Sequence, residues 1–481
     1  MELIILLPAV FSWAFMAWGS VRKALLAVYL PCLLLLPDYY VIRIKHLPAI
    51  TFADAAILPI ALALIITSMR YWRPQWMDLW VFVYCFSVVL SQGLGTEMAN
   101  GQWVNFFSAE LTFDRRLGGN INDSGMMAFA RMMEMILPYM VGKLLIERAG
   151  PDGFQLRRPL VARMSILMAA VGFISILDFV KGGSSWQAIG SKLFPAQFVD
   201  WPPQMRWGFG RIAGPYGHAI LAGMIFLMGL IYCLWLCNVD PEWGKRRLIA
   251  GLPINLRNMV LFGLFLGLLM TQSRGPWLGM LLALGFVGLT RILSVGRAAV
   301  TFLGLLAVFS MVVFVVGQKY TAMDMDKAAT EDQRSAIYRA QLLDAYAPIV
   351  AQRKAFGWGI TNYPVAPGQK SIDNEYLLLS VTQGFFGLGM FLVIAAGNGL
   401  RLLRFVAMPL AHEDRLLVFA HLAILIGLLT TVATVYMGEQ VTPMYFLMTG
   451  WIAGMHPRPV EGSDAGLPGF KRSFGFRRVV A

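Results

Sequence analysis

The chain has 481 residues, of which 58% are hydrophobic and only 14% are charged. Long apolar runs recur along nearly all of it, as is typical of an all-α polytopic membrane protein rather than a soluble domain. The net charge of +13 does not indicate nucleic-acid binding, because the Lys and Arg residues lie between the apolar runs, where they set orientation. We therefore expect the lipid bilayer, and no nucleic acid, as a partner.

Candidate transmembrane helices begin at the N-terminus, where the first apolar run lacks the basic segment and small-residue cleavage site of a signal peptide. We expect this run to be a retained span. Cys32, Cys85, Cys233 and Cys237 all lie inside apolar runs, which argues against a disulfide framework or a zinc site. The sequence predicts about 12 to 13 spans, at about residues 2–18, 24–37, 52–68, 77–94, 125–146, 159–180, 215–236, 257–271, 276–292, 298–317, 375–400, 416–436 and 441–456.

Alternate loops differ in charge. One set is short and densely basic, so the positive-inside rule makes it cytoplasmic. The other set includes three long segments, about residues 95–124, 181–211 and 318–374, which also carry acidic residues. Long loops in compact proteins are usually functional or disordered, so we expect the chemistry on this outer side. The basic set comprises Arg22 and Lys23, Arg70 and Arg73, the group at 143–163, Lys245, Arg246, Arg247 and Arg257, Arg291 and Arg297, Arg401, Arg404 and Arg415, and Lys471, Arg472, Arg477 and Arg478 in the C-terminal tail.

Arg131, Glu134 and Asp178 are charged residues that fall within predicted spans. Arg131 and Glu134 are spaced i, i+3 on one helix, close enough to form an ion pair that reduces the cost of burial. A proton relay and a structural pair both fit this spacing. Asp178 lies at the outer end of its span, where an ordinary interfacial carboxylate is also expected.

Two short stretches each place an arginine ahead of a Gly-Pro break that opens an apolar run. They are RWGFGRIAGPYGHAILA at 206–222, with Arg211, and MTQSRGPWLG at 270–279, with Arg274. Proline is tolerated at the start of a helix, so Pro215 and Pro276 predict helix starts. Exposed amides, the helix dipole and a guanidinium would together suit a phosphate.

The alternative for both arginines is a snorkelling membrane anchor. Two such stretches on one membrane face favour a functional role. The runs on either side of residue 273 are too short to cross the bilayer upright, so we expect a broken or tilted pair of helices. Irregular backbone at that depth needs a protein or water-filled surround, and Ser273, Arg274 and Gly275 are therefore expected to line a cavity that opens outward.

The longest outer loop contains a predicted amphipathic helix. Its apolar residues are spaced i, i+1, i+4, i+7 and i+8, and it should end near Lys354 and pack on the membrane surface or against the spans. Arg339 lies on the N-terminal shoulder of this face and is expected to point towards the headgroup level. The chain re-enters the membrane at 372–377, where Asp373 can cap the next helix. The apolar residues are Leu342, Leu343, Tyr346, Ile349 and Val350.

With these residues, the chain resembles the O-antigen ligase and polymerase superfamily of bacterial inner-membrane glycosyltransferases. The similarity covers about residues 200–395, and only the order and spacing of its motifs together make it specific. The N-terminal third matches in hydropathy and in the segment around Asp54. The motifs are Arg211 with Gly-Pro-Tyr-Gly-His218, Ser273-Arg274-Gly275-Pro276-Trp277, Arg339 followed by Gly357-Trp358-Gly359, and Asp373-Asn374-Glu375-Tyr376-Leu377 with Gly384 and Gly387-Leu388.

This resemblance implies a GT-C-like fold in the inner membrane. It implies transfer of saccharide from undecaprenyl pyrophosphate to an acceptor glycan or lipid at the periplasmic face, with no cofactor. Arg211 and Arg274 would hold the pyrophosphate, assisted by Arg339, and Asp373 would activate or orient the acceptor hydroxyl. Further substrate-binding candidates are His218, Ser273, Asn374, Glu375 and Tyr376.

The chain departs from the ligase pattern at one position. Ligases of this group carry His-Asn where this chain has Asp373-Asn374. Asp373, Glu375 or His218 would then be the base, with a carboxylate pKa adjusted by burial or by arginines. The change favours a polymerase for exopolysaccharide or O-antigen, with a chain-length regulator as a further partner. A ligase acting on lipid A core, transfer to protein, and a solute or bicarbonate transporter remain alternatives.

The resemblance also divides the chain into three regions. Residues 1–200 are expected to hold N-terminal spans with outer loops. Residues 201–400 would form the ligase- or polymerase-like core, including the periplasmic loop at 318–374. Residues 401–481 would add the last spans and a basic cytoplasmic tail.

Overall fold

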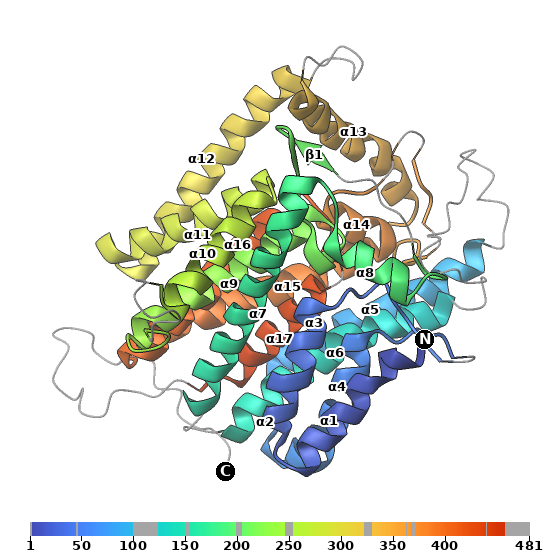
Figure 1. Cartoon of the computed structure of the whole chain (residues 1–481). Coiled ribbons are helices and arrows are strands. Elements are labelled where there is room, and N and C mark those ends of the chain that lie inside the picture. The colour runs from blue at the N-terminus through green and yellow to red at the C-terminus, as the bar shows by residue number, and fades with distance from the viewer. Residues whose placement is uncertain are drawn as a thin grey trace, which may run out of the picture.

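The computed structural model describes residues 2–44, 47–99, 124–149, 154–198, 204–245, 254–321, 330–361, 363–366, 369, 371–438 and 440–456. In this part of the chain helices dominate, joined by one two-stranded sheet (Figure 1). Most of the expected outer segment at 95–124 lies outside the described residues, as do Arg246, Arg247 and the basic tail.

The first half of the chain supplies the helices on the N-terminal side of the bundle. Its second span is irregular: a π-helical turn precedes Pro31, which lacks the N–H that a regular turn would use. The elements are η1 (Glu2–Leu6), α1 (Leu7–Ala17), α2 (Val21–Ala24), η2 (Leu25–Tyr29), α3 (Leu30–Leu35), α4 (Phe52–Ser68), η3 (Met69–Tyr71), α5 (Trp76–Ala99), α6 (Ser124–Ala149), α7 (Phe154–Lys181) and α8 (Ser185–Leu193).

The second half supplies the central helix, a hairpin and an outer helix. Among the seven helices that are long and apolar enough to span a bilayer, α9 is the most enclosed, with 89% of its apolar segment buried. The elements are β1 (Met205–Arg206), β2 (Phe209–Gly210), η7 (Gly214–Tyr216), α9 (Ala219–Val239), α10 (Leu256–Met270), α11 (Arg274–Ile292), α12 (Val295–Thr321), α13 (Glu331–Gln352), α14 (Glu375–Thr382), α15 (Gly384–Val406), α16 (His412–Thr431) and α17 (Val441–Gly454).

Seven of the described helices are long and apolar enough to span a bilayer, which confirms an all-α polytopic membrane protein. Of the other predicted spans, 24–37 is built from short pieces, and 375–400 is divided at Gly384 into α14 and α15. Two further apolar helices, Glu2–Ala17 and Leu256–Met270, are shorter than a full span. The seven are Phe52–Tyr71, Trp76–Leu94, Leu156–Lys181, Ala219–Val239, Arg274–Ile292, Gly384–Val406 and His412–Thr431.

The predicted amphipathic helix of the outer loop is confirmed as α13, which ends two residues before Lys354. Its apolar face packs against α14 of the bundle, where Tyr346 and Ile349 share a buried cluster with Leu377 and Val381. Leu343 was wrongly assigned to this face. It is 53% exposed, because the packed stripe follows the i, i+4, i+7 spacing from Leu342 and leaves the next residue on the outer side.

A clasp of backbone hydrogen bonds fastens the chain beyond α13 to the break between α14 and α15. Trp358 N donates to Val381 O at 2.9 Å, Gly359 N to Thr382 O at 2.8 Å, and Phe385 N to Lys354 O at 2.7 Å. Gly357 and Gly384 have positive φ angles, and a Cβ on either would lie about 2.5 Å from the opposite backbone, so side chains are not tolerated there. The Gly357-Trp358-Gly359 motif therefore holds loop and bundle together. The bonds belong to residues 353–359 and 381–386.

α13 and the β1–β2 hairpin lie at one end of the bundle, and the turn between α1 and α2 lies at the other (Figure 1). The basic residues Arg22 and Lys23 are on α2, next to that turn. The outer-loop elements and this basic loop are thus on opposite sides, as the charge pattern of the sequence predicts.

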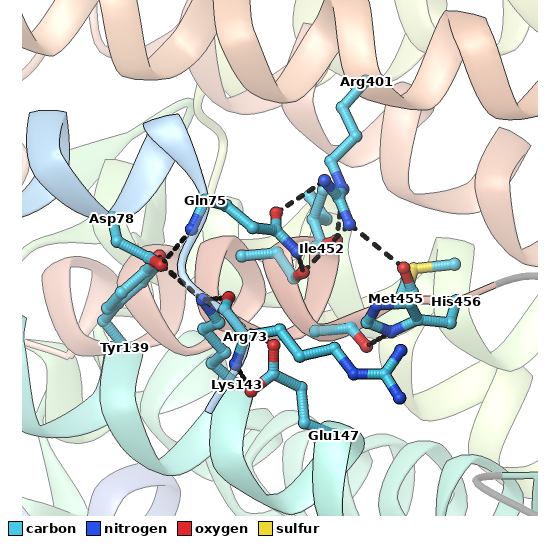
Figure 2. A network of polar contacts seen from close by, with 12 residues as sticks. Arg73, Gln75, Asp78, Tyr139, Lys143, Glu147, Arg401, Ile452, Met455 and His456 are labelled. Carbon is cyan, nitrogen blue, oxygen red and sulfur yellow. Dashed lines mark hydrogen bonds and ion pairs between the residues drawn. The ribbon is translucent and has the colours of Figure 1, made fainter. Parts of the chain in front are cut away.

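A buried polar network joins the ends of α5, α6, α15 and α17 (Figure 2). Lys143 is fully buried, and its Nζ lies 2.5 Å from Oδ2 of Asp78. It also donates to Arg73 O at 2.8 Å. Tyr139 donates to the other oxygen of Asp78. Arg401 donates to Oε1 of Gln75 at 2.6 Å and to backbone carbonyls at the end of α17. A buried charge needs such partners, so these helix ends are held in one arrangement.

Candidate functional site

The β1–β2 hairpin brings two arginines to the bundle. Its two-residue turn consists of Trp207 and Gly208, which both have positive φ angles, 53° and 82°. Two positive φ angles are the requirement of a type I′ turn, whose twist matches an antiparallel pair. Arg206 on β1 donates from Nη1 to Gln272 O at 2.7 Å. Arg206 was missing from the predicted site, and it enters because the hairpin sets it beside Arg211.

Arg211 is fastened to the break between α10 and α11. Its Nε donates to Thr271 O at 3.1 Å, and its Nη2 donates to Oγ of Ser273 at 2.9 Å. The break itself is confirmed: α10 ends at Met270 and α11 begins at Arg274. Gln272, in between, has a φ of 49°, a left-handed conformation that is uncommon for a residue with a side chain and often marks a functional site. Arg211 is thereby held at the N-terminus of α11.

Four arginines share this region, and we call Arg206, Arg211, Arg274 and Arg339 the arginine cluster. Burial, followed by the charges of Arg206, Arg339 and Arg274, lowers the pKa of Arg211 to about 10. Burial likewise lowers the pKa of Arg339, with Arg274 and Arg206 adding to the effect. Mutual repulsion of this kind requires the guanidinium groups to be near one another. The cluster is therefore electrostatically prepared for a multiply charged anion.

Asp373 raises the pKa of both Arg211 and Arg339, so it lies beside the cluster. Its Oδ1 accepts a hydrogen bond from Oγ of Ser371 at 2.7 Å. The prediction that Asp373 caps the following helix is wrong. Asn374 is the cap, and its side chain accepts from Leu377 N at 3.1 Å, because α14 begins at Glu375. Asp373 stands one position before the cap, so its carboxylate does not cap α14 and can interact with the arginine cluster.

A search of protein families finds that residues 259–392 match the O-antigen ligase family. The chain carries an O-antigen ligase domain. The predicted resemblance to the O-antigen ligase and polymerase superfamily is thus confirmed. Among curated proteins no significant match was found.

The O-antigen ligase domain contains Arg274, Arg339 and Asp373, together with the break, the outer helix and the clasp. Arg206 and Arg211 precede it in the sequence. The hairpin and the hydrogen bonds to residues 271–273 bring them to it. The cluster is therefore assembled from inside and outside the matched segment.

Two other predicted residues of the O-antigen ligase domain point into the bundle. Glu375 is only 4% exposed, and its Oε2 accepts from Met437 N at 2.6 Å. Tyr376 is half-buried and donates from its hydroxyl to Leu429 O at 2.8 Å. Tyr376 holds α14 against the end of α16, and Glu375 holds it against the segment that follows. Glu375 is thus occupied with a structural contact, and Asp373 is the carboxylate that the structure brings to the cluster.

His218 precedes the O-antigen ligase domain in the sequence. A helix starts at Pro215, as predicted, but it is a short one, and the long helix begins later than the predicted 215. Pro215 belongs to the short helix η7, and α9 begins only at Ala219, because Gly217 adopts a φ of 68° that ends the first turn. His218 is the N-cap of α9, and its Nδ1 accepts from Ile220 N at 3.2 Å. A packing or hydrogen-bonding role, which the sequence left open, therefore accounts for this nitrogen.

The charges that a transport path would need have structural partners outside the O-antigen ligase domain. Arg131 Nη1 lies 2.8 Å from Oε2 of Glu134, as the i, i+3 spacing predicts. Arg131 also donates to Met437 O at 2.8 Å. Asp178 accepts from the backbone and side chain of Ser185, the first residue of α8. These contacts explain the three residues without a conducting path.

Proposed function

We propose that this protein is a membrane glycosyltransferase that transfers or polymerises saccharide linked to undecaprenyl pyrophosphate. A membrane glycan ligase or polymerase follows in general terms from the O-antigen ligase domain. The donor, the membrane face and the roles of single residues are the proposal. The observation that carries it is the arginine cluster, to which three separate segments of the chain contribute: the β1–β2 hairpin, α11 and α13.

The chemistry requires a diphosphate to leave the sugar. An acceptor hydroxyl attacks the anomeric carbon, the bond from that carbon to the diphosphate oxygen breaks, and undecaprenyl pyrophosphate departs with the electron pair. Asp373 takes the hydroxyl proton or orients the hydroxyl. Arg211 and Arg274, with Arg206 and Arg339, bind the diphosphate and stabilise its growing charge. Four cations match this charge, so we propose that the transfer needs no metal ion.

The proposed face is the periplasmic one, in the inner membrane of a bacterium. The short basic loops favour a cytoplasmic position for Arg22 and Lys23. The outer-loop elements lie at the opposite end of the bundle (Figure 1), which supports an outward-facing site.

Polymerisation is the form of the reaction we favour. The aspartate at position 373, where ligases carry histidine, supports a polymerase whose acceptor is the sugar end of another lipid-linked repeat. The ligase reaction on lipid A core is the second candidate, since the matched family is that of the O-antigen ligases. A repeat-unit flippase and a chain-length regulator among neighbouring genes would support polymerisation, whereas lipid A core enzymes would support ligation.

The test replaces Arg274 by alanine. Arg274 is exposed at the first position of α11, so the variant should fold and insert normally. Arg291→Ala, at the other exposed end of the same helix, is the matched control. In cells that lack the native gene, Arg274→Ala should leave undecaprenyl-pyrophosphate-linked repeats unpolymerised on a glycan gel, while Arg291→Ala restores polymer. Wild-type polymer from a normally expressed Arg274→Ala protein would refute the proposed role of the cluster.

A further inference from the structure

The hairpin that carries Arg206 exposes apolar side chains next to the arginine cluster. Met205 is 51% exposed, Trp207 61% and Phe209 48%. Phe209 stacks on Phe179 of α7, with ring centroids 4.8 Å apart, which fixes the hairpin to the bundle. Trp207 stands at the tip in a left-handed conformation. A group of exposed apolar side chains beside polar residues marks an interaction surface.

The apolar surface continues along α11. Arg274 begins an exposed stripe at helical spacing that runs through Leu281, 68% exposed, and Leu284, 45% exposed. Trp277 lies on this stripe one turn after Arg274, and its ring centroid is 6.2 Å from that of Trp207. Only 28% of the most apolar segment of α11 is buried, the smallest share among the seven spanning helices. The stripe therefore starts at the cluster and faces outward from the bundle.

The lower part of this stripe has room beside it. A Cβ built on Gly285 or Gly288 would meet no atom within 4 Å. From Arg274 to Gly288 the helix rises by about 21 Å, at 1.5 Å per residue. That length covers about two-thirds of the hydrocarbon core of a bilayer. A long apolar chain could thus follow α11 from the headgroup level towards the middle of the membrane.

We propose that Trp207 and the exposed stripe of α11, Trp277 to Gly288, bind the isoprenoid chain of the lipid-linked donor. This inference rests on the proposed function, because it assigns the lipid end of the same substrate. The charge of the neighbouring cluster indicates which lipid binds along this stripe. Four clustered arginines suit a diphosphate, and the stripe begins where the diphosphate would be held. An ordinary phospholipid presents a single phosphate, so it fits the cluster less well.

The test measures binding of the diphosphate and of the isoprenoid chain separately. The purified protein, in nanodiscs of a neutral phosphatidylcholine, is titrated with undecaprenyl pyrophosphate and with inorganic pyrophosphate, which has no chain. The variants are Trp207→Ala and Arg211→Ala. Trp18→Ala is the matched control, because Trp18 is 87% exposed and follows α1 in the turn to α2, and this turn lies at the opposite end of the bundle. Trp207 is exposed too, so its replacement should not disturb folding.

Trp207→Ala should raise the Kd for undecaprenyl pyrophosphate about tenfold and change the Kd for inorganic pyrophosphate less than about twofold. Arg211→Ala should weaken both ligands. If Trp207→Ala leaves undecaprenyl pyrophosphate unaffected, or if Trp18→Ala weakens it equally, Trp207 is only a membrane anchor and the chain-binding site is refuted. If Arg211→Ala affects neither ligand, the proposed function fails instead, whatever Trp207→Ala does.

Discussion

Ser273 accepts a hydrogen bond from Nη2 of Arg211 at 2.9 Å, across the break between α10 and α11. Ser273 is only 1% exposed and itself donates to Thr271 O, so its hydroxyl is fixed in place. The bond thus sets the direction of a guanidinium that comes from 62 residues earlier in the chain.

Ser273→Ala should therefore reduce transfer without unfolding the protein. A hydrogen bond to a charged group contributes about 1.5 kcal/mol at a partly exposed site, or about a tenfold loss in kcat/KM. Ser294→Ala is the control, because Ser294 accepts an equivalent bond from Arg297 Nε at 3.0 Å in an exposed position outside the cluster. Equal transfer rates for the wild type and Ser273→Ala would show that this bond does not orient Arg211 for the reaction.

Anion binding should depend on pH through Arg211. Burial and the neighbouring arginines lower its pKa to about 10, so it loses its charge as the pH rises through that value. A bound diphosphate favours the charged form, and its affinity should then fall by up to about tenfold per pH unit above pH 10. Titrations with inorganic pyrophosphate between pH 8 and pH 10.5 should show this fall in the wild type and a smaller one in Arg211→Ala. Ionisation of pyrophosphate affects the wild type and Arg211→Ala alike. An equal fall in affinity for the two proteins would therefore contradict the assignment of the pH dependence to Arg211.

Asp373→Asn should separate binding from chemistry. If Asp373 takes the acceptor proton, kcat should fall about 100-fold or more. Removing a negative charge beside the arginine cluster should meanwhile tighten binding of inorganic pyrophosphate. Asn374→Ala is the structural control, because it removes the cap of α14 and should cost about 1 kcal/mol of stability. A loss of both kcat and pyrophosphate affinity in Asp373→Asn would indicate a structural role instead.

Lys143→Met should destabilise the fold at a distance from the site. It leaves the Asp78 carboxylate buried without its cation, which typically costs about 3–5 kcal/mol. The midpoint of thermal unfolding in detergent should fall, and Asp78→Asn combined with Lys143→Met should recover part of the loss. Lys245→Met, which breaks an exposed pair with Glu242, should have little effect. An unchanged midpoint for Lys143→Met would mean that the network in Figure 2 does not support the bundle.

Hydropathy and helical spacing predicted much of the fold. The apolar stripe of α13 follows the spacing from Leu342 to Val350, and the break at Gln272 follows from two runs that are each too short to cross a bilayer. The boundaries near glycine were predicted less well. The α9 start depends on the φ angle of Gly217, which a Gly-Pro pair alone does not reveal.

The site was only partly predictable, because its residues meet through tertiary contacts. Arg206 belongs to strands of two residues each, which hydropathy cannot detect. The available signal was Trp207-Gly208 flanked by alternating residues, a pattern that suits a tight hairpin. Asp373 and Asn374 are neighbours just before α14. Only the exact start of the helix shows that Asn374 caps it and that Asp373 does not.

The clasp between residues 353–359 and 381–386 has a mechanical consequence. It anchors the C-terminal end of α13, and Arg339 lies thirteen residues, or about 20 Å, from that end along the helix. Because the apolar face of α13 is buried against α14 along the stretch in between, the helix is a rigid arm that holds Arg339 at the arginine cluster.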